Sequence, residues 1–126
     1  DVRLQRECYI GLASTAMRTE RIELATGVTD PYSRHPAITA AAIATLDELS
    51  KGRAVLGLGL GGAGFRELGL EKKLPVAALR ESITMIRGLL QGEKVTQNGK
   101  VVSLANGRLD FGHCAASMDD RQHALH

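Results

Sequence analysis

Residues 26–62 read TGVTDPYSRHPAITAAAIATLDELSKGRAVLGLGLGG, and this stretch decides the fold. It contains a strand end, a polar loop, a helix beginning at Pro36, a tight turn, a second strand and a glycine-rich loop. A strand, a helix and a second strand in this order form one unit of a parallel sheet. Ligands bind at the carboxyl ends of such strands, which here are residues 26–28 and the glycines that follow Leu58.

Helical and strand patterns flank this unit on both sides. Residues 4–18 carry apolar side chains at four-residue steps, which predicts a helix, and residues 21–28 form an apolar run of strand length. Within the unit we expect a helix over 36–49 and a strand over 54–58. A third helix begins at Pro75 and has one apolar stripe, made of Val76, Leu79, Ile83, Ile86 and Leu90. Alternating helices and strands are typical of a parallel α/β fold.

The pattern changes near the carboxyl end of the chain. Residues 94–97 and 100–103 flank Asn98-Gly99, the preferred two-residue turn of a β-hairpin, so we predict a hairpin here. A second turn is expected at Asn106-Gly107. After Phe111 the apolar residues follow neither a helical nor a strand period, which predicts an irregular tail.

Composition and charge exclude several classes of partner. The net charge is +2 with acidic and basic residues interleaved, so we expect no nucleic acid and no membrane surface as partner. Two distant cysteines, Cys8 and Cys114, form neither a disulfide framework nor a metal spacing. The chain shows no apolar run long enough for a membrane span and no signal-peptide pattern, so we expect a cytoplasmic protein.

The glycine loop has three interpretations. Residues 59–64 match the G-x-G-x-x-G pattern, whose backbone approaches a pyrophosphate at a helix N-terminus. The dinucleotide fingerprint requires a helix that opens at the glycines, whereas residues 65–74 intervene before Pro75. A flexible loop without a ligand is the second interpretation. We favour the third, a glycine loop at the end of a barrel strand, where bare backbone lets a cofactor come close.

Other candidate residues are less specific. Arg34 and His35 stand at a helix start, where positive charge is unfavourable, which indicates another task such as binding an anion or fixing the loop. Cys8 lies on an apolar helix face and is expected to be buried. We expect no metal site, although the tail contains ligand types without a framework, namely His113, Cys114, Asp119, Asp120, His123 and His126.

Three segments taken together resemble a known superfamily. TGVTDPYSRHP (26–36), TLDELSKGR (45–53) and VLGLGLGG (55–62) resemble the luciferase-like monooxygenases, and within them the deazaflavin-dependent branch that includes methylenetetrahydromethanopterin reductases. The resemblance covers about residues 4–111. It implies a partial (β/α)₈ TIM barrel with about two barrel strands, three helices and a β-hairpin insertion.

The chain is accordingly divided into a partial barrel segment at 1–92, a hairpin insertion at 93–111 and an irregular tail at 112–126. A (β/α)₈ barrel typically takes about 250 residues. We therefore expect a truncated form or a fragment, with barrel parts missing on both sides.

The resemblance also implies a cofactor site. In members of the family the strand that ends here in Gly27-Val28 often carries a bulge with a non-prolyl cis peptide, which supports one face of the cofactor ring. By this resemblance Gly27, Val28 and Thr29 would support the ring, and Gly59 and Gly61 would line the same pocket. The implied cofactor is coenzyme F420, with FMN as the alternative. The catalytic residues stay unassigned, because glycine and leucine occupy the second strand end, where some members place a carboxylate or a cysteine.

The implied activity is hydride transfer between the deazaflavin, or FMN, and a small organic substrate. In many relatives the helices matching 4–18 and 36–49 pair across a dimer, so we expect a homodimer or a higher homo-oligomer. Two alternatives stay open. One is a non-catalytic barrel fragment that self-associates through its helices. The other is a NAD-binding module, which requires a helix opening at Gly62.

Overall fold

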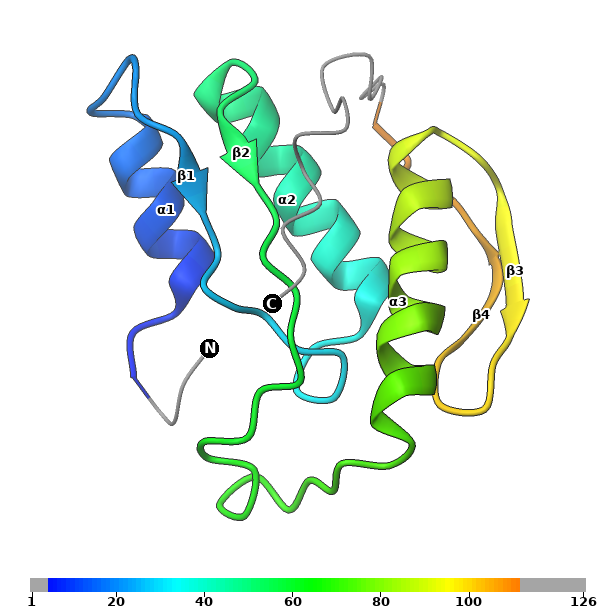
Figure 1. The fold of residues 1–126 in the computed structure, drawn as a ribbon. Coiled ribbons are helices and arrows are strands. Elements are labelled where there is room, and N and C mark those ends of the chain that lie inside the picture. The colour runs from blue at the N-terminus through cyan, green and yellow to red at the C-terminus, as the bar shows by residue number, and fades with distance from the viewer. Residues whose placement is uncertain (1–4, 112–126) are drawn as a thin grey trace.

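The computed structural model describes residues 5–111 (Figure 1). Three helices lie beside one another, with α2 between α1 and α3, and a short parallel strand pair lies against α2. An antiparallel hairpin flanks α3 on the opposite side from α2. In chain order the elements are α1 (Cys8–Ala16), β1 (Leu24–Ala25), α2 (Pro36–Ser50), β2 (Ala54–Val55), α3 (Pro75–Leu90), β3 (Val95–Asn98) and β4 (Ser103–Gly107).

The helices match the predicted ones closely, with one exception. The helices α2 and α3 begin at the two predicted prolines, because proline at the first helical position lacks only an N–H that would be unsatisfied there anyway. The helix α1 begins at Cys8 rather than at residue 4. Its N-cap is Glu7, whose carboxylate accepts a hydrogen bond from the Ile10 N–H at 2.8 Å.

The strands are shorter than predicted. β1 and β2 are parallel, and the paired residues are Leu24 with Ala54 and Ala25 with Val55. Pairing stops after two residues and resumes at a single bridge between Thr29 and Leu58. The ladder is interrupted because the chain bulges between Ala25 and Thr29.

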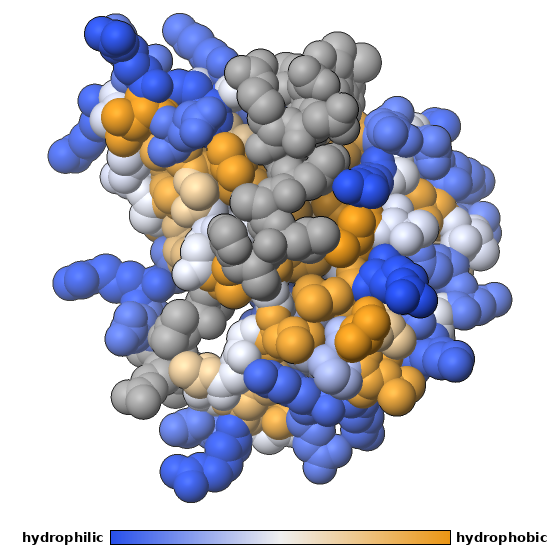
Figure 2. All heavy atoms as spheres, viewed as in Figure 1, coloured by the Kyte–Doolittle hydropathy of each residue, from blue (hydrophilic) through white to orange (hydrophobic). Residues whose placement is uncertain are grey.

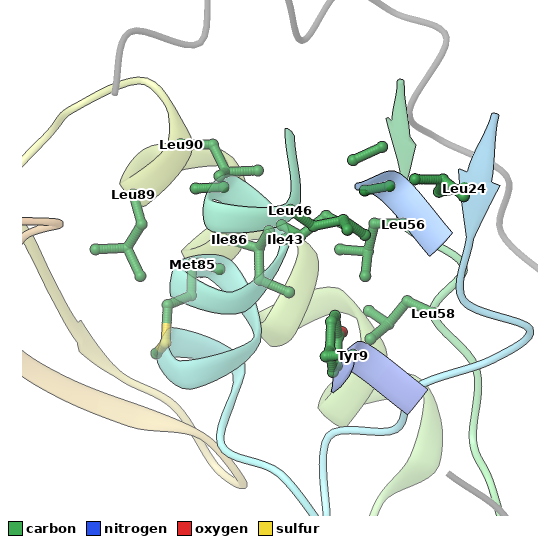
Figure 3. Packing of buried hydrophobic residues seen from close by; sticks show 14 of the residues in the cluster. Tyr9, Leu24, Ile43, Leu46, Leu56, Leu58, Met85, Ile86, Leu89 and Leu90 are labelled. Atoms are coloured by element: carbon green, nitrogen blue, oxygen red, sulfur yellow. The ribbon is translucent and has the colours of Figure 1, made fainter. Parts of the chain in front are cut away.

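The core lies between the strand pair and the helices (Figure 3). Ile43 on α2 and Met85 on α3 are fully buried, and Tyr9 enters from α1. Cys8 packs against this core, but it is only half-buried, whereas the sequence analysis predicted a buried residue. The labelled core side chains in Figure 3 are Tyr9, Leu24, Ile43, Leu46, Leu56, Leu58, Met85, Ile86, Leu89 and Leu90.

Arg53, which directly precedes β2, forms hydrogen bonds to the carboxyl-terminal ends of α1 and α2. Its Nη atoms donate to the backbone carbonyls of Ala16, Thr19 and Ile22 at 2.8–3.0 Å. Its Nε donates to the Ser50 carbonyl at 2.7 Å. Carbonyls at helix C-termini lack partners within the helix, and one guanidinium here satisfies those of both α1 and α2.

The hairpin forms as predicted, but its turn is different. Asn98 pairs with Ser103, so residues 99–102 form a four-residue loop and the prediction of a two-residue Asn98-Gly99 turn is wrong. The reason lies on α3, where the Glu81 carboxylate accepts hydrogen bonds from the backbone N–H groups of Lys100, Val101 and Val102 at 2.7–2.9 Å. A two-residue turn could not present three N–H groups to one carboxylate.

The predicted second turn is also wrong. Asn106 and Gly107 lie inside β4, where the register shifts between Val95 and Gln97 on the partner strand. Asn106 has a positive φ of 51°, and its N–H donates to the Thr96 hydroxyl at 3.1 Å. Asparagine tolerates this left-handed conformation, and here it forms a β-bulge instead of a turn.

Apolar side chains also reach the surface. Figure 2 shows them gathered in the middle of the face seen in Figure 1, with charged side chains around the rim. Within residues 5–111, every helix is too short or too polar to cross a lipid bilayer.

We expect the hairpin loop to depend on the ionisation of Glu81. Backbone N–H groups, those of Val102 and Val101 foremost, hold the pKa of the Glu81 carboxyl below its usual value of 4.5. Stabilisation of the loop should therefore be complete above that value and be lost as the pH falls through the lowered pKa of the folded state. Hydrogen exchange should show protected amides at 100–102 at pH 7 and lower protection in Glu81→Gln.

The control for this experiment is Glu67→Gln, which removes an exposed carboxylate from another loop. Protection at 100–102, corrected for the intrinsic exchange rate, should be the same as in the unmodified chain. Equal protection in Glu81→Gln and Glu67→Gln would contradict the role assigned to Glu81.

Candidate cofactor site

A one-residue bulge shapes the carboxyl end of β1. From Leu24 to Thr29 the chain advances five positions, whereas from their partners Ala54 to Leu58 it advances four. Beyond the bulge the parallel ladder resumes, because Thr29 donates to the Gly57 carbonyl and accepts from the Gly59 N–H, both at 2.9 Å. The peptide bond inside the bulge, between Gly27 and Val28, is cis, as expected for the resembled family.

Thr26 and Gly57 hold the two strands together at the bulge. The Thr26 hydroxyl donates to the Gly57 carbonyl and accepts from the Gly57 N–H, each at 2.8 Å, so one side chain joins the strands where their backbone pairing is interrupted. A Cβ at position 57 would lie 2.0 Å from the Thr26 carbonyl oxygen, so only glycine fits. The sequence analysis missed Gly57, although a glycine inside the apolar run 54–58 signals a close backbone approach.

The bulge turns its backbone toward the open side of the strand pair. Gly27 is exposed, and within residues 5–111 nothing beyond its chain neighbours lies within 4 Å of the position its Cβ would occupy. Val28 is half-buried, whereas the Thr29 side chain is fully buried. The bulge therefore offers bare backbone on one face and packs a side chain into the core on the other.

Asp30 organises the loop that follows the bulge. Its side chain is 2% exposed, and Oδ1 accepts hydrogen bonds from the backbone N–H groups of Tyr32 and Ser33 at 2.8 and 2.7 Å. Gly61 lies directly against it, since a Cβ there would come within 2.9 Å of the Asp30 Cβ, and its φ is +58°. Aspartate commonly closes a turn in this way, so its place before Pro31 in a polar loop was the available signal.

The loop after β1 (residues 30–35) contacts the loop after β2 (residues 59–74) directly. The Tyr32 hydroxyl donates to the Lys73 carbonyl at 2.9 Å. Its ring also meets the Phe65 ring edge to face, with centroids 5.7 Å apart. The Lys72 ammonium lies 5.8 Å from the centre of the Phe65 ring. The glycine loop is therefore packed against its neighbour, with Gly59 buried and Gly61 exposed.

Arg34 and His35 fix the polar loop in place. Arg34 forms an ion pair with Glu7, the N-cap of α1, and its guanidinium lies 4.7 Å from the centre of the Tyr9 ring. His35 caps α2, because its Nδ1 accepts from the Ala37 N–H at 3.1 Å. Its Nε2 then carries the proton and donates to the Ser103 carbonyl at 3.0 Å. Both ring nitrogens are therefore used to hold the loop, which confirms the expectation that this pair fixes the loop.

The structure brings the five predicted residues to two adjacent strand ends. Gly27, Val28 and Thr29 form the bulge, Gly59 is bonded to Thr29, and Gly61 lies against the neighbouring loop. The dinucleotide hypothesis is wrong, because residues 61–74 consist of turns and irregular chain without a helix, and the next helix begins only at Pro75. The predicted metal-ligand types of the tail fall outside the described residues.

A separate groove of about 570 Å³ lies at the opposite end of the strands, around Arg53. None of the five predicted residues lines it. Its lining comes from the ends of α1 and α2 and includes Met17, Leu49 and Lys51. In barrel proteins, residues at the amino-terminal ends of the strands contribute to stability, whereas ligands bind at the carboxyl ends.

Comparison with known families identifies the class of protein. Residues 2–112 match the luciferase-like monooxygenase family model, so the chain belongs to this family. The matched region holds the bulge, the glycine loop and the packed helices. The observed fold is a partial (β/α)₈ barrel of this family, which confirms the fold predicted from the sequence.

Individual relatives lie in the branch that the three sequence segments resembled. The chain is 46% identical over 107 residues to a 5,10-methylenetetrahydromethanopterin reductase of Methanolobus tindarius, a match that covers 84% of this chain and 33% of the relative. The corresponding reductase of Archaeoglobus fulgidus is 39% identical, with 84% and 32% covered. The chain thus spans about a third of the length of the curated relatives it matches.

A solved structure agrees with the sequence matches. The coenzyme F420-dependent tetrahydromethanopterin reductase of Methanopyrus kandleri superposes with a TM-score of 0.77 at 34% identity, and the match covers 83% of this chain and 35% of that one. The match supports both the fold and the branch of the family.

We expect Gly57→Ala to destabilise the chain. The added methyl group would strike the Thr26 carbonyl, and relief requires moving the backbone at the bulge. Overpacking of this kind costs about 1–3 kcal/mol. Urea unfolding followed by circular dichroism should show this loss in the free energy of unfolding.

The matched control is Gly11→Ala on α1, where none of the described residues outside its own helical turn lies within 4 Å of the new Cβ. That variant should gain about 0.5–1 kcal/mol, because glycine is costly inside a helix. A Gly57→Ala chain as stable as Gly11→Ala would show that the close contact with Thr26 is not required.

Proposed function

We propose that the chain belongs to an F420-dependent oxidoreductase that transfers a hydride between the deazaflavin and a small organic substrate. The observation that carries the proposal is the bulge at the end of β1, where Gly27 is exposed, lacks a side chain and has no other described residue, apart from its chain neighbours, within 4 Å of its Cβ position. A planar ring needs such a surface, because side chains there would hold it away. The solved relative of similar fold is named as F420-dependent, which supports the deazaflavin over FMN.

The residues of the chain fit this task in distinct ways. Gly27 and Val28 would contact one face of the ring, and Thr29 would contribute through its backbone, because its side chain is buried. Gly59 and Gly61 would form the neighbouring wall. When bound, F420 supplies the hydride chemistry, and the protein excludes water and orients the substrate. The proton donor has no candidate among these residues.

A complete pocket needs more walls than two strand ends provide. The chain covers about a third of its relatives, so the substrate is expected to contact barrel parts that lie outside this sequence. The proposed substrate is therefore a small organic molecule, whose identity depends on those other barrel parts. A cytoplasmic setting suits a soluble cofactor of this kind and the sparse use of cysteine.

A second candidate function is self-association through the helices. Several large apolar side chains on or next to α1 and α2 are exposed, among them Ile10 at 72% on α1, Met17 at 70% at the C-cap of α1, and Ile38 at 57% on α2. Ile10 and Met17 lie two turns apart and so share one face of α1. Burial of this face in a homodimer would remove apolar area from water.

We expect Ile38→Glu to shift the chain toward monomer. The added charge would be costly to bury in an interface between copies of α2. Sedimentation velocity at micromolar concentration should show a larger species for the unmodified chain and a smaller one for the variant. Thr84→Glu, at an exposed polar position of α3, outside the proposed interface, is the control. A purely monomeric unmodified chain would refute self-association.

We expect Gly27→Leu to abolish binding of F420 while leaving the chain folded. The leucine side chain has room among the described residues, none of which lies within 4 Å of its Cβ apart from its chain neighbours, but it would occupy the space assigned to the ring. Fluorescence titration with F420 should give saturable binding for the unmodified chain and at least tenfold weaker binding for the variant.

Gly11→Leu is the control, because it adds the same side chain to open space on α1. Its affinity for F420 should equal that of the unmodified chain. Titration with FMN should give weaker binding than F420. Equal affinity of Gly27→Leu and the unmodified chain for F420 would contradict the assigned ring position.

A further inference from the structure

Two buried hydroxyl groups lie behind the bulge and are not used by the proposed cofactor contacts. One belongs to Thr29, whose side chain is 0% exposed, and the other to Tyr9, which is 8% exposed. Neither oxygen has a hydrogen-bond partner of good geometry within residues 5–111. Buried polar groups without partners are costly, so such a pair requires an explanation.

Thr29 is the residue at which the strand ladder resumes after the bulge. Its N–H and carbonyl are both bonded to β2 residues, Gly57 and Gly59, so its backbone is held firmly on one side. Its side chain points into the core, away from the exposed Gly27. Thr29 directly follows Gly27 and Val28 in the chain. A hydrogen bond to its hydroxyl would therefore help to fix the position of these two residues.

Tyr9 reaches this position from α1. Figure 3 shows its ring beside Leu58, the bridge partner of Thr29. The Arg34 guanidinium covers the ring at 4.7 Å, and Arg34 is itself ion-paired to Glu7. The phenol is thus held by the same contacts that join the polar loop to α1.

The protonation state of Tyr9 suits a hydrogen-bond donor. Burial raises the pKa of the Tyr9 phenol to about 12, while the neighbouring Thr29 hydroxyl and the Arg34 guanidinium lower it. The phenol therefore keeps its proton at every physiological pH. The Thr29 hydroxyl oxygen is a suitable acceptor.

We propose that Tyr9 is a positioning residue, whose hydroxyl bonds to the Thr29 hydroxyl and thereby fixes the Gly27-Val28 bulge against the cofactor ring. This inference rests on the proposed function for its cofactor readout, but the contact itself can be tested without a cofactor. Tyr9 acts through Thr29 and does not touch the ring.

The test combines Tyr9→Phe, Thr29→Val and the double variant. Loss of one hydrogen bond should weaken F420 binding about two- to tenfold in each single variant. The double variant should bind no more weakly than either single one, because both changes remove the same interaction. Thr29→Ser keeps the hydroxyl and should restore near-normal binding.

Two further measurements separate positioning from a general loss of stability. Thr39→Val removes another fully buried hydroxyl that has no partner among the described residues, and it should leave F420 affinity unchanged. In the cofactor-free chain, NMR amide shifts of Gly27 and Val28 should change in Tyr9→Phe and in Thr29→Val but not in Thr39→Val.

The outcomes are distinguishable. If the unmodified chain fails to bind F420, the proposed function fails, and the amide shifts alone decide the role of Tyr9. Amide shifts at 27–28 that are unchanged in Tyr9→Phe would overturn the positioning role. Additive losses of affinity in the double variant, or an equal loss in Thr39→Val, would also overturn it.

Discussion

The close approach of Thr26 to Gly57 is the contact on which the candidate site depends. The threonine hydroxyl binds both the N–H and the carbonyl of Gly57, and the absence of a Cβ lets the two backbones meet. This contact lets β1 carry one extra residue without losing its pairing to β2. The ladder resumes at Thr29, and Gly27, between Thr26 and Thr29, is exposed. A larger residue at 57 would push the strands apart at the point where the bulge begins.

The surrounding structure holds this contact from several directions. Arg53 ties the amino-terminal strand ends to the helix ends, and Asp30 closes the loop beyond the bulge while supporting Gly61. Tyr32 and Phe65 then join that loop to the glycine loop. On the proposed function, the ligand would bind at one end of the strand pair and Arg53 would stabilise the other, the division known from barrel proteins.

Sequence patterns predicted the elements well but not the contacts between them. The helices at Pro36 and Pro75 were accessible because proline and apolar spacing are local signals. The hairpin turn was not, because Glu81, distant in sequence, supplies the acceptor that selects a four-residue loop. For the same reason Gly57 and Asp30 escaped notice, since their roles arise from partners on the neighbouring strand or loop. The five predicted site residues came from family resemblance, and the structure explains how the bulge brings them to adjacent strand ends.

The central claim is that residues 27–29 and 57–61 form one wall of a deazaflavin pocket. The most direct test is an NMR titration of the isotope-labelled chain with F420, followed through its amide signals. We expect the largest shift changes at 27–29 and at 57–61, with little change in the helices or around Arg53. Saturable changes that are concentrated instead in the groove around Arg53, or the absence of any change at millimolar F420, would contradict the claim.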